Sequence, residues 1–350
     1  MIWTTWRQHR AEAAVWAVIL AGLVAAMLAV GSIARSRASA LGLPGCTTRD
    51  GNCNDALDAL HRAFHTIPPF TAALIAIPLL AGMFWTAPLV SLEYEAGTHR
   101  LAWTQTVSPL RWITVKIVLI FGALAGLALI LGLLAAAWTL DPLTAAFGGR
   151  YNSTWYDTQG IVPVACMLFA LALGVAASAL IRRTIPAMAV TLIVYAAVRI
   201  PIHWIRGNFW PAVTHTYNVD VATLLQRRIG PLQDGYLSTL TPGDWIQTAT
   251  ITDSTGHRYV PNELSFDVFS RYCPSVRPAA TAGGDPQPLD PATIAACKPK
   301  VAGLTLHETV TYQPAAHFWP IQTVETLIFV GLAALLVIVA VLTVARRRPS

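Results

Sequence analysis

IVPVACMLFALALGVAASALIRRTIPAMAVTLIVYAAVRIPIH, residues 161–203, is the stretch of sequence that decides the fold. It holds two nearly continuous apolar runs, 161–181 and 185–203, and only Arg182, Arg183 and Thr184 separate them. An α-helix needs about 20 mostly apolar residues to cross a hydrocarbon core of roughly 30 Å. The stretch therefore predicts two membrane-spanning helices joined by a short basic turn.

The rest of the chain repeats this pattern in four more apolar runs, at residues 13–33, 69–92, 113–140 and 321–345. The composition agrees, because 55% of the 350 residues are hydrophobic and only 12% are charged. We therefore predict an all-α transmembrane bundle of six helices, with Pro78 and Pro88 kinking the second. A cleavable signal peptide would leave five, but the first run exceeds the roughly 7–15 apolar residues of such signals.

The positions of Lys and Arg predict the orientation, because cytoplasmic loops carry an excess of these residues. If both termini are cytoplasmic, the short inner segments hold ten of the 24 basic residues and only three of the 18 acidic ones. The ten are Arg7, Arg10, Arg100, Arg111, Lys116, Arg182, Arg183, Arg346, Arg347 and Arg348. This bias predicts an N-in/C-in topology. Because topology explains the net charge of +6, no nucleic-acid partner is expected.

Two segments outside the bilayer are long enough to fold. In the first outside loop, residues 34–68, apolar side chains recur at helical spacing over 55–65. His61 and His65 lie one turn apart there, but nothing supplies a further metal ligand, so a solvated helix face is the preferred interpretation. In the second segment, residues 204–320, alternation at 245–252 and 304–312 around turn residues 253–256 predicts strands.

The chain is therefore expected to divide into three parts. Residues 1–203 hold helices one to five, with an inner loop at 91–116. Residues 204–320 form a small mixed α/β extracytoplasmic domain between helices five and six, with a short helix opening at Asp290. Residues 321–350 are the sixth helix and a basic cytoplasmic tail.

Four of the five cysteines fall in the two outside segments, where disulfides form. Cys46 and Cys53 lie in the first segment, Cys273 and Cys297 in the second, and Cys166 inside a helix. Four cysteines allow three pairings. Proximity in sequence favours bridges between Cys46 and Cys53 and between Cys273 and Cys297.

A few residues near or within the spans suggest packing roles. Arg199 and Glu325 have similar predicted depth, so we expect either an ion pair between helices five and six or two side chains that reach separately toward the headgroups. Aromatic residues cluster beside the fifth and sixth spans and are expected to be membrane-interface anchors rather than a ligand site: Trp204, Phe209, Trp210, Phe318 and Trp319. Gly122 and Gly126 form a GxxxG pattern, which favours close packing within the subunit, with a dimer interface as the alternative.

Motifs for enzymatic chemistry are missing from the sequence. Gly-Lys never occurs, so there is no P-loop for ATP, and there is no G-x-S-x-G nucleophile motif. His307-Glu308 lacks the second histidine of H-E-x-x-H. No enzymatic activity and no cofactor are therefore predicted.

The predicted inner loop, SLEYEAGTHRLAWTQTVSPLRWITVK at residues 91–116, is too polar to span the membrane. Gly97 suits a turn and Thr98 suits the cap of a short amphipathic helix. Ser108 and Pro109 suit the start of the next span. A helix in this loop would offer a docking surface to a cytoplasmic partner, whereas the alternative is an interfacial loop without one.

The chain resembles ABC-2 type transporter permeases, in particular the actinobacterial ABC transporter permeases. The resemblance runs through IWTTWRQHRAEA, WTAPLVSLEYEAGTHRLAWTQTVSPLRW, DTQGIVPVACMLFALALGVAASALIRRTIPAM and the final RRR. It covers all six spans and is weakest in residues 204–320. It implies a coupling helix in the inner loop that contacts a separate ATPase subunit. The coupling residues would be Glu93, Glu95, Gly97, Thr98, His99 and Arg100.

The same resemblance implies that Trp3, Trp6, Arg7 and Arg10 lie on an interfacial helix along the lipid of the inner leaflet. The implied function is that of a permease subunit of an ABC exporter in the bacterial plasma membrane. It would pair with a second permease subunit, identical or different, to export an apolar or amphipathic compound. The alternative from another class is a membrane sensor or immunity protein whose outside domain binds a ligand.

Overall fold

The computed structural model describes residues 2–43, 51–65, 67–96, 109–136, 149–219, 243–259, 295–296, 299–300 and 305–346. The chain divides into two compact units. One unit, Met1–Trp210 with Ala316–Ser350, is a helical bundle, and the other, Pro211–Ala315, contains a four-stranded sheet.

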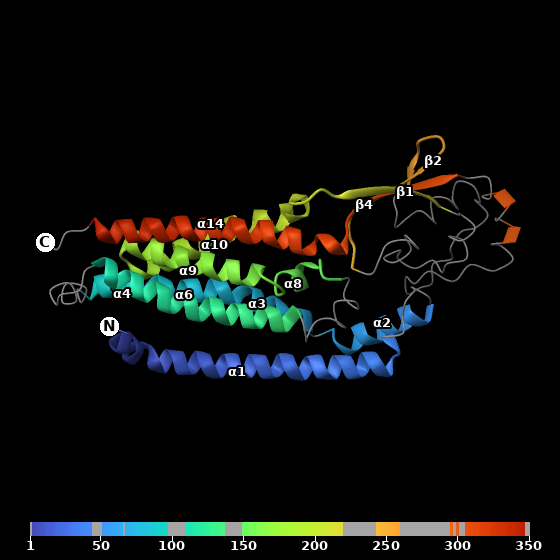
Figure 1. Cartoon of the computed structure of the whole chain (residues 1–350). Coiled ribbons are helices and arrows are strands. Elements are labelled where there is room, and N and C mark those ends of the chain that lie inside the picture. The colour runs from blue at the N-terminus through green and yellow to red at the C-terminus, as the bar shows by residue number, and fades with distance from the viewer. Residues whose placement is uncertain are drawn as a thin grey trace, which may run out of the picture. The chain divides into compact units, whose positions relative to one another are not determined.

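The bundle contains long helices that run back and forth between its two ends (Figure 1). Its elements are α1 (Ile2–Ala40), α2 (Gly51–Ala63), α3 (Ile67–Ala81), the π-helical turn η2 (Gly82–Thr86), α4 (Ala87–Glu95), α6 (Pro109–Leu134), α8 (Ser153–Tyr156), α9 (Val162–Ile181), α10 (Thr184–Ile205), the 3₁₀ turn η4 (Arg206–Asn208) and α14 (Phe318–Ala345). Within the described residues, six helical stretches are long and apolar enough to cross a membrane. The predicted six-helix bundle is thereby confirmed, and so is the short helix predicted over 55–65, which corresponds to α2.

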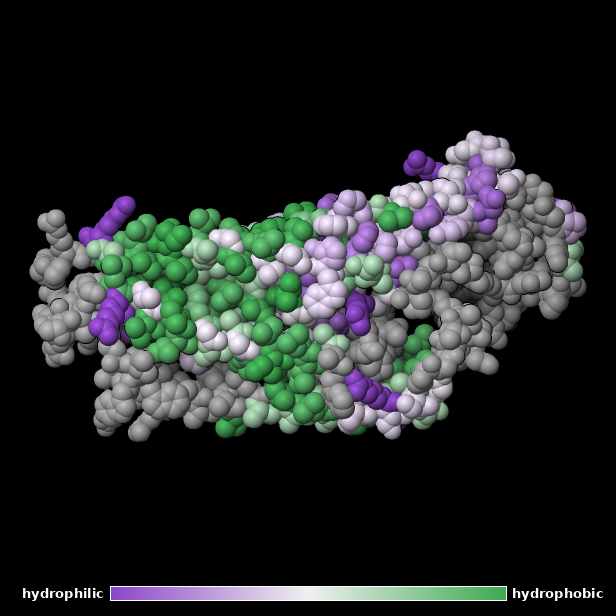
Figure 2. Space-filling model, viewed as in Figure 1, coloured by the Kyte–Doolittle hydropathy of each residue, from purple (hydrophilic) through white to green (hydrophobic). Residues whose placement is uncertain are grey.

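Helix α9 forms the centre of the bundle, where it packs against α3, η2, α4, α6, α10 and α14. In its span 78% of the residues are buried, against 22% in the span that includes α14. The outer helices direct large side chains such as Phe84, Val118 and Leu327 away from the bundle. Their apolar surface covers much of the visible face in Figure 2, as expected of a protein whose solvent is lipid.

The second span contains a widened turn between the two prolines that predict a kink. Pro78 lies inside α3, Pro88 lies in the first turn of α4, and η2 joins the two helices. Thr86 Oγ1 is within 3.0 Å of the carbonyl oxygens of both Gly82 and Leu171. A Cβ atom on Gly174 of α9 would lie 2.2 Å from that hydroxyl, so only glycine permits this contact.

The GxxxG pattern on α6 makes no close contact with the other described residues, unlike the packing expected. Among those residues, Cβ atoms added to Gly122 and Gly126 would meet nothing within 4 Å. Gly132 is the glycine of α6 that makes a close approach, because a Cβ there would lie 2.7 Å from the carbonyl oxygen of Gly160. This contact brings the segment before α9 against the end of α6.

Two ends of the bundle are named here by the elements that lie there. The α8 end carries residues 149–161, the end of α6, the end of α10 and the start of α14. The α4 end carries the end of α4, the starts of α6 and α10, and the end of α9. The start of α1 and the end of α14 also lie at the α4 end (Figure 1).

The second unit contains an antiparallel sheet of β1 (Val213–Val219), β2 (Trp245–Asp253), β3 (Arg258–Tyr259) and β4 (Leu306–Gln313). Its strand order is β1-β4-β2-β3. Ile251, Leu306 and Val310 are buried on one face, while threonines line the other. The strands predicted at 245–252 and 304–312 are confirmed as β2 and β4, with β3 following the predicted turn at 253–256. β1 was not predicted, and the helix predicted to open at Asp290 falls outside the described residues.

Candidate functional site

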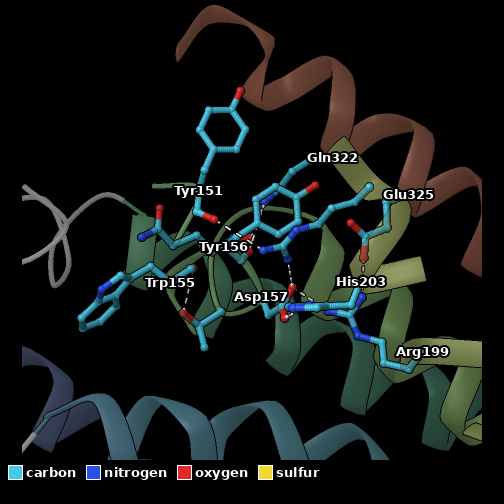
Figure 3. A network of polar contacts seen from close by, with 11 residues as sticks. Tyr151, Trp155, Tyr156, Asp157, Arg199, His203, Gln322 and Glu325 are labelled. Carbon is cyan, nitrogen blue, oxygen red and sulfur yellow. Dashed lines mark hydrogen bonds and ion pairs between the residues drawn. The ribbon is translucent and has the colours of Figure 1, made fainter. Parts of the chain in front are cut away.

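A buried polar network at the α8 end is the most elaborate cluster of side chains among the described residues (Figure 3). It depends on the segment 149–161, which Gln322 of α14 holds in place. Gln322 Oε1 accepts a hydrogen bond from the backbone N–H of Ile161 at 3.0 Å, and its Nε2 donates to the carbonyl oxygen of Gln159 at 3.0 Å. Gly160, with a φ of 71°, makes the turn beneath this side chain.

Asp157 is the centre of the network. Its Oδ1 lies 2.8 Å from Arg206 Nη1 and 2.6 Å from Arg199 Nη2, and its Oδ2 lies 3.2 Å from His203 Nδ1. Arg199 also reaches α14, where its Nη1 is 2.5 Å from Glu325 Oε1. The chain of contacts therefore ties the segment before α9 to α10 and α14.

The four groups that form these ion pairs, two guanidinium groups and two carboxylates, are almost completely buried. The side chain of Arg199 is 9% exposed, that of Asp157 5%, that of Arg206 3% and that of Glu325 0%. Two carboxylates balance two guanidinium groups, which is the condition under which ions persist away from water. Burial opposes ionisation of Asp157, but the hydrogen bond with His203 and the charges of the two arginines outweigh it and hold its pKa below the ordinary value.

Aromatic side chains cover the network. The Arg206 guanidinium lies 4.2 Å from the centre of the Tyr156 ring, and Phe318 packs edge-on against both Tyr151 and Tyr156. Burial is the main cause that raises the pKa of the Tyr156 hydroxyl above its ordinary value. Phe318 is only 3% exposed, so the prediction that it is a membrane-interface anchor was wrong for this residue. For the other members of that predicted aromatic cluster, Trp204, Phe209, Trp210 and Trp319, the anchoring role stays a prediction.

The ion pair between Arg199 and Glu325 was one of two alternatives from the sequence, and it is confirmed. Asp157, Arg206 and Gln322 were not predicted as partners. The only feature of the sequence that could have pointed to Asp157 and Arg206 is their position. Asp157 precedes the fourth span by a few residues, and Arg206 follows helix α10 of the fifth. Only the fold brings both to the same depth as Arg199.

A second and smaller cluster, at the α4 end, surrounds two of the predicted coupling residues. Glu93 forms an ion pair with Lys116 of α6. Glu95 accepts hydrogen bonds from Thr184 at the start of α10, at 2.9 Å from the backbone N–H and 3.1 Å from the hydroxyl. We call this set, together with Ser91 and Ser178, the α4 clamp.

Ser91 completes the α4 clamp from inside α4. Its backbone N–H donates to Ser178 Oγ of α9 at 2.7 Å, and its hydroxyl lies 2.9 Å from Thr184 Oγ1. Both Ser91 and Ser178 are fully buried. The end of α4 is thus fixed to α6, α9 and α10 by side chains.

Other predicted site residues fall where no side chain is described. Gly97, Thr98, His99 and Arg100 lie outside the described residues, as do Cys46, Cys273 and Cys297. Trp3, Trp6, Arg7 and Arg10 lie in α1 and Cys53 lies in α2, each without a described side chain. The predicted disulfides and the predicted interfacial helix therefore stay predictions, while Cys166 in α9 is a buried free thiol.

Metal-ligating side chains do not gather among the described residues, where no group of three His, Cys, Asp or Glu is in range of a common ion. His65, in the turn just after α2, has its Nδ1 3.0 Å from the carbonyl oxygen of Arg62 in the last turn of that helix. The α8-end network has no exposed nucleophile and base that face each other. Its chemistry is that of a closed set of ion pairs, which fixes helices relative to one another.

Comparison with known proteins gives one match. A family model described as ABC-2 membrane transporter related matches residues 17–206, which is more than half of the 350 residues. The match covers the first five spans, the α4 clamp and the part of the α8-end network that precedes α14. No match was found among curated proteins or among solved structures.

Proposed function

The chain belongs to the family of ABC-2 membrane transporter related proteins, and on that premise we propose that it is the membrane-spanning permease subunit of an ABC exporter. The chain is a multi-pass membrane protein with six apolar helices. The proposal adds that a separate subunit hydrolyses ATP and that this subunit docks on residues 97–108, on the cytoplasmic side of a bacterial plasma membrane. The topology is then N-in/C-in, as the positions of the basic residues predict.

The α4 clamp is the observation that carries the coupling part of this proposal. Residues 97–108 connect α4 to α6, and the Glu93–Lys116 ion pair joins those two helices directly beside the connection. Glu95, at the last position of α4, caps the start of α10. A displacement imposed on this connection would thus pass to α4, α6 and α10 together instead of being absorbed by one loose helix.

Contacts with α9 would carry such a displacement of α4 into the core of the bundle. Ser91 binds Ser178 of α9, and one turn further Thr86 of η2 contacts the carbonyl oxygen of Leu171, also in α9. Because α9 packs against α3, α6, α10 and α14 as well as α4, a shift of α4 along it changes the packing of most of the bundle. Packed interfaces of this kind favour discrete arrangements over continuous deformation.

The experiment that tests the proposal uses the full chain with a candidate P-loop ATPase from the same organism. We expect the two proteins to purify together and the permease to raise the ATPase rate. Arg100→Glu in the predicted coupling helix should abolish co-purification. Arg62→Glu in α2 is the matched control, because it makes the same charge change on an exposed helix that the topology places on the opposite side.

Two outcomes would overturn the proposal. One is that Arg100→Glu and Arg62→Glu lower ATPase binding equally, which would remove the coupling role of residues 97–108. The other is that no candidate ATPase binds or is stimulated, which would favour the sensor or immunity protein. Labelling of a cysteine placed at His99 by a membrane-impermeant reagent in intact cells would likewise contradict the orientation.

A further inference from the structure

The turn between α9 and α10, at the α4 end of the bundle, holds two adjacent arginines. Arg182 is the C-cap of α9, where its backbone N–H donates to the carbonyl oxygen of Ser178 at 3.0 Å. Arg183 follows as the N-cap of α10, in an extended conformation. Both residues are exposed, and neither side chain has an ion pair or a hydrogen bond within the described ranges. Two guanidinium groups are therefore available to a ligand.

The backbone of Arg182 is strained, which indicates that its side chain has a role. With a φ of 59° and a ψ of 11° it is left-handed, and it is the only residue other than glycine with a positive φ in the described part of the chain. Glycine is the usual residue at such a helix end, because a Cβ atom is crowded there. Topology explains a basic residue at this end, but not an arginine at a position that favours glycine. Strain of this kind is concentrated at functional sites.

The residues on both sides of the two arginines belong to the α4 clamp, so the turn is held in place. Ser178 Oγ accepts a hydrogen bond from the backbone N–H of Ser91 at 2.7 Å. Thr184 contacts Ser91 Oγ at 2.9 Å and donates to both carboxylate oxygens of Glu95. A ligand at the turn would thus meet a backbone that is already ordered, which lowers the entropic cost of binding.

The charges around the turn favour an anion. Glu93 is paired with Lys116, and Glu95 accepts its two hydrogen bonds from Thr184. Glu95 therefore offsets only part of the positive charge of the two arginines. A guanidinium group presents parallel N–H donors that match the oxygens of a phosphate, and neighbouring arginines can contact the same phosphate.

Apolar side chains next to the arginines decide which phosphate compound fits. Leu180 is 55% exposed and Ile185 is 80% exposed, and each belongs to a membrane span. Hydrophilic side chains border the apolar surface at this end of the bundle (Figure 2). Exposed apolar side chains of a span face the acyl chains of lipids. A lipid can contact both kinds of surface, whereas a free phosphate ion would contact only the arginines.

We propose that the α9–α10 turn binds an anionic phospholipid, with the phosphate at Arg182 and Arg183 and the acyl chains along Leu180 and Ile185. Phosphatidylglycerol is a simple representative of this class, because its head has no positive charge to compete with the arginines. The site requires no ATPase subunit, so it goes beyond the proposed permease function and stands or falls separately from it.

The test measures photolabelling of the full chain in phosphatidylcholine nanodiscs. Two probes carry the same diazirine-bearing acyl chains, one with a phosphatidylglycerol head and one with a phosphatidylcholine head. We expect the first to label peptides from the end of α9 and the start of α10 about tenfold more than the second. Unlabelled phosphatidylglycerol should compete this labelling away, and inorganic phosphate should not. Equal labelling by both probes, or competition by inorganic phosphate, would overturn the proposal.

Two double variants separate a site at the turn from a general attraction to basic residues. Arg182→Gln with Arg183→Gln should lower labelling by phosphatidylglycerol about tenfold. Arg111→Gln with Arg346→Gln is the matched control, because it removes the same charge from two other exposed arginines at the same end. This control should leave the labelling within about twofold. An equal loss in both double variants would overturn the proposal.

The single variant Arg182→Gly separates binding from folding. Glycine adopts the left-handed conformation without strain, so the melting temperature should not fall. Labelling by phosphatidylglycerol should nevertheless fall severalfold, because one guanidinium group is lost. Unchanged labelling in this variant would contradict the role of Arg182. Loss of ATPase co-purification in the Arg182→Gln, Arg183→Gln variant, with lipid labelling unchanged, would assign the arginines to a protein interface and overturn the lipid site.

Discussion

The two ends of the bundle use polar side chains in opposite ways. At the α8 end, four charged groups lie 0% to 9% exposed and depend on one another through a closed set of ion pairs. At the α4 end, the carboxylate of Glu93 is 23% exposed and Glu95 is exposed, and their partners are Lys116 and the start of a helix. Buried ions are strongly coupled, whereas exposed ones contribute little. The α8 end is thus expected to resist rearrangement more strongly than the α4 end.

Removing the charge of Asp157 should have the largest effect. Asp157→Asn keeps the shape of the side chain but leaves Arg199 and Arg206 with one carboxylate between them, and breaking a buried pair in this way typically costs about 3–5 kcal/mol. The free energy of unfolding, measured in detergent with a chemical denaturant, should fall by that order. Glu95→Gln makes the same chemical change at the α4 end and serves as the comparison. An equal loss in both variants would refute the contrast between the two ends.

A double-mutant cycle on Arg199 and Glu325 should show the second largest effect. Arg199→Met and Glu325→Met each leave one buried charge without its partner, while the double variant removes the pair. We expect the double variant to be about 2 kcal/mol more stable than the sum of the two single losses predicts. The measurement is the same denaturant titration on all four proteins. Additive losses would mean that the two side chains, although 2.5 Å apart, are not energetically coupled.

The contrast between the ends was only partly predictable from the sequence. The spans were predictable because length and hydropathy alone specify a membrane helix. The Arg199–Glu325 pair was predictable as one of two alternatives, because equal depth on neighbouring helices leaves few partners. Asp157 escaped prediction because its position depends on the close approach of Gly160 to Gly132, which is a contact between distant parts of the sequence.

The α4 clamp and the sheet show where a signal was present but not used. Glu93 and Lys116 both lie in the inner loop segment, 23 residues apart, and pair because α4 and α6 lie side by side at that end. In β1, valine, histidine and tyrosine alternate with threonine and asparagine over Val213–Val219, which is the pattern of a half-buried strand. The register of that strand against β4 depends on tertiary packing, which no local pattern specifies.

Glu308 in β4 is a buried carboxyl group that differs from those of the bundle, because no positively charged side chain is paired with it among the described residues. Its exposed fraction is 3%, its Oε1 makes no hydrogen bond among the described residues, and burial raises its pKa from 4.5 to about 7. The folded protein therefore holds this proton where the unfolded chain has lost it. The resulting stability is present below about pH 4.5 and is lost as the pH rises through about 7.

The stability of the sheet should depend on pH, and Glu308→Gln should remove this dependence. Between pH 5 and pH 8 the sheet should lose about 1 kcal/mol, once solvent screening is allowed for. Hydrogen exchange of β4 amides, corrected for the intrinsic rate, measures this loss. Glu308→Gln should abolish it, and His307→Gln, on the opposite face of the same strand, should not. A pH dependence that persists in Glu308→Gln would assign the titration to another group.

Substitutions of Glu95 should have the smallest effect on stability. They are also the most informative about coupling, because they change a contact between α4 and α10. Glu95→Gln retains an oxygen for the backbone N–H of Thr184 and loses only the negative charge at the start of α10, so it should cost about 0.5 kcal/mol. Glu95→Ala removes the cap as well and should cost about 1 kcal/mol. Both variants should fold, yet Glu95→Ala removes one of the two side-chain contacts that join α4 to Thr184 of α10, the other being that of Ser91, and should lower ATPase stimulation severalfold without preventing the ATPase from binding. If stimulation survives in Glu95→Ala, α4 transmits motion through Ser91 alone, and the exposed carboxylate at this end of the bundle is not part of the coupling.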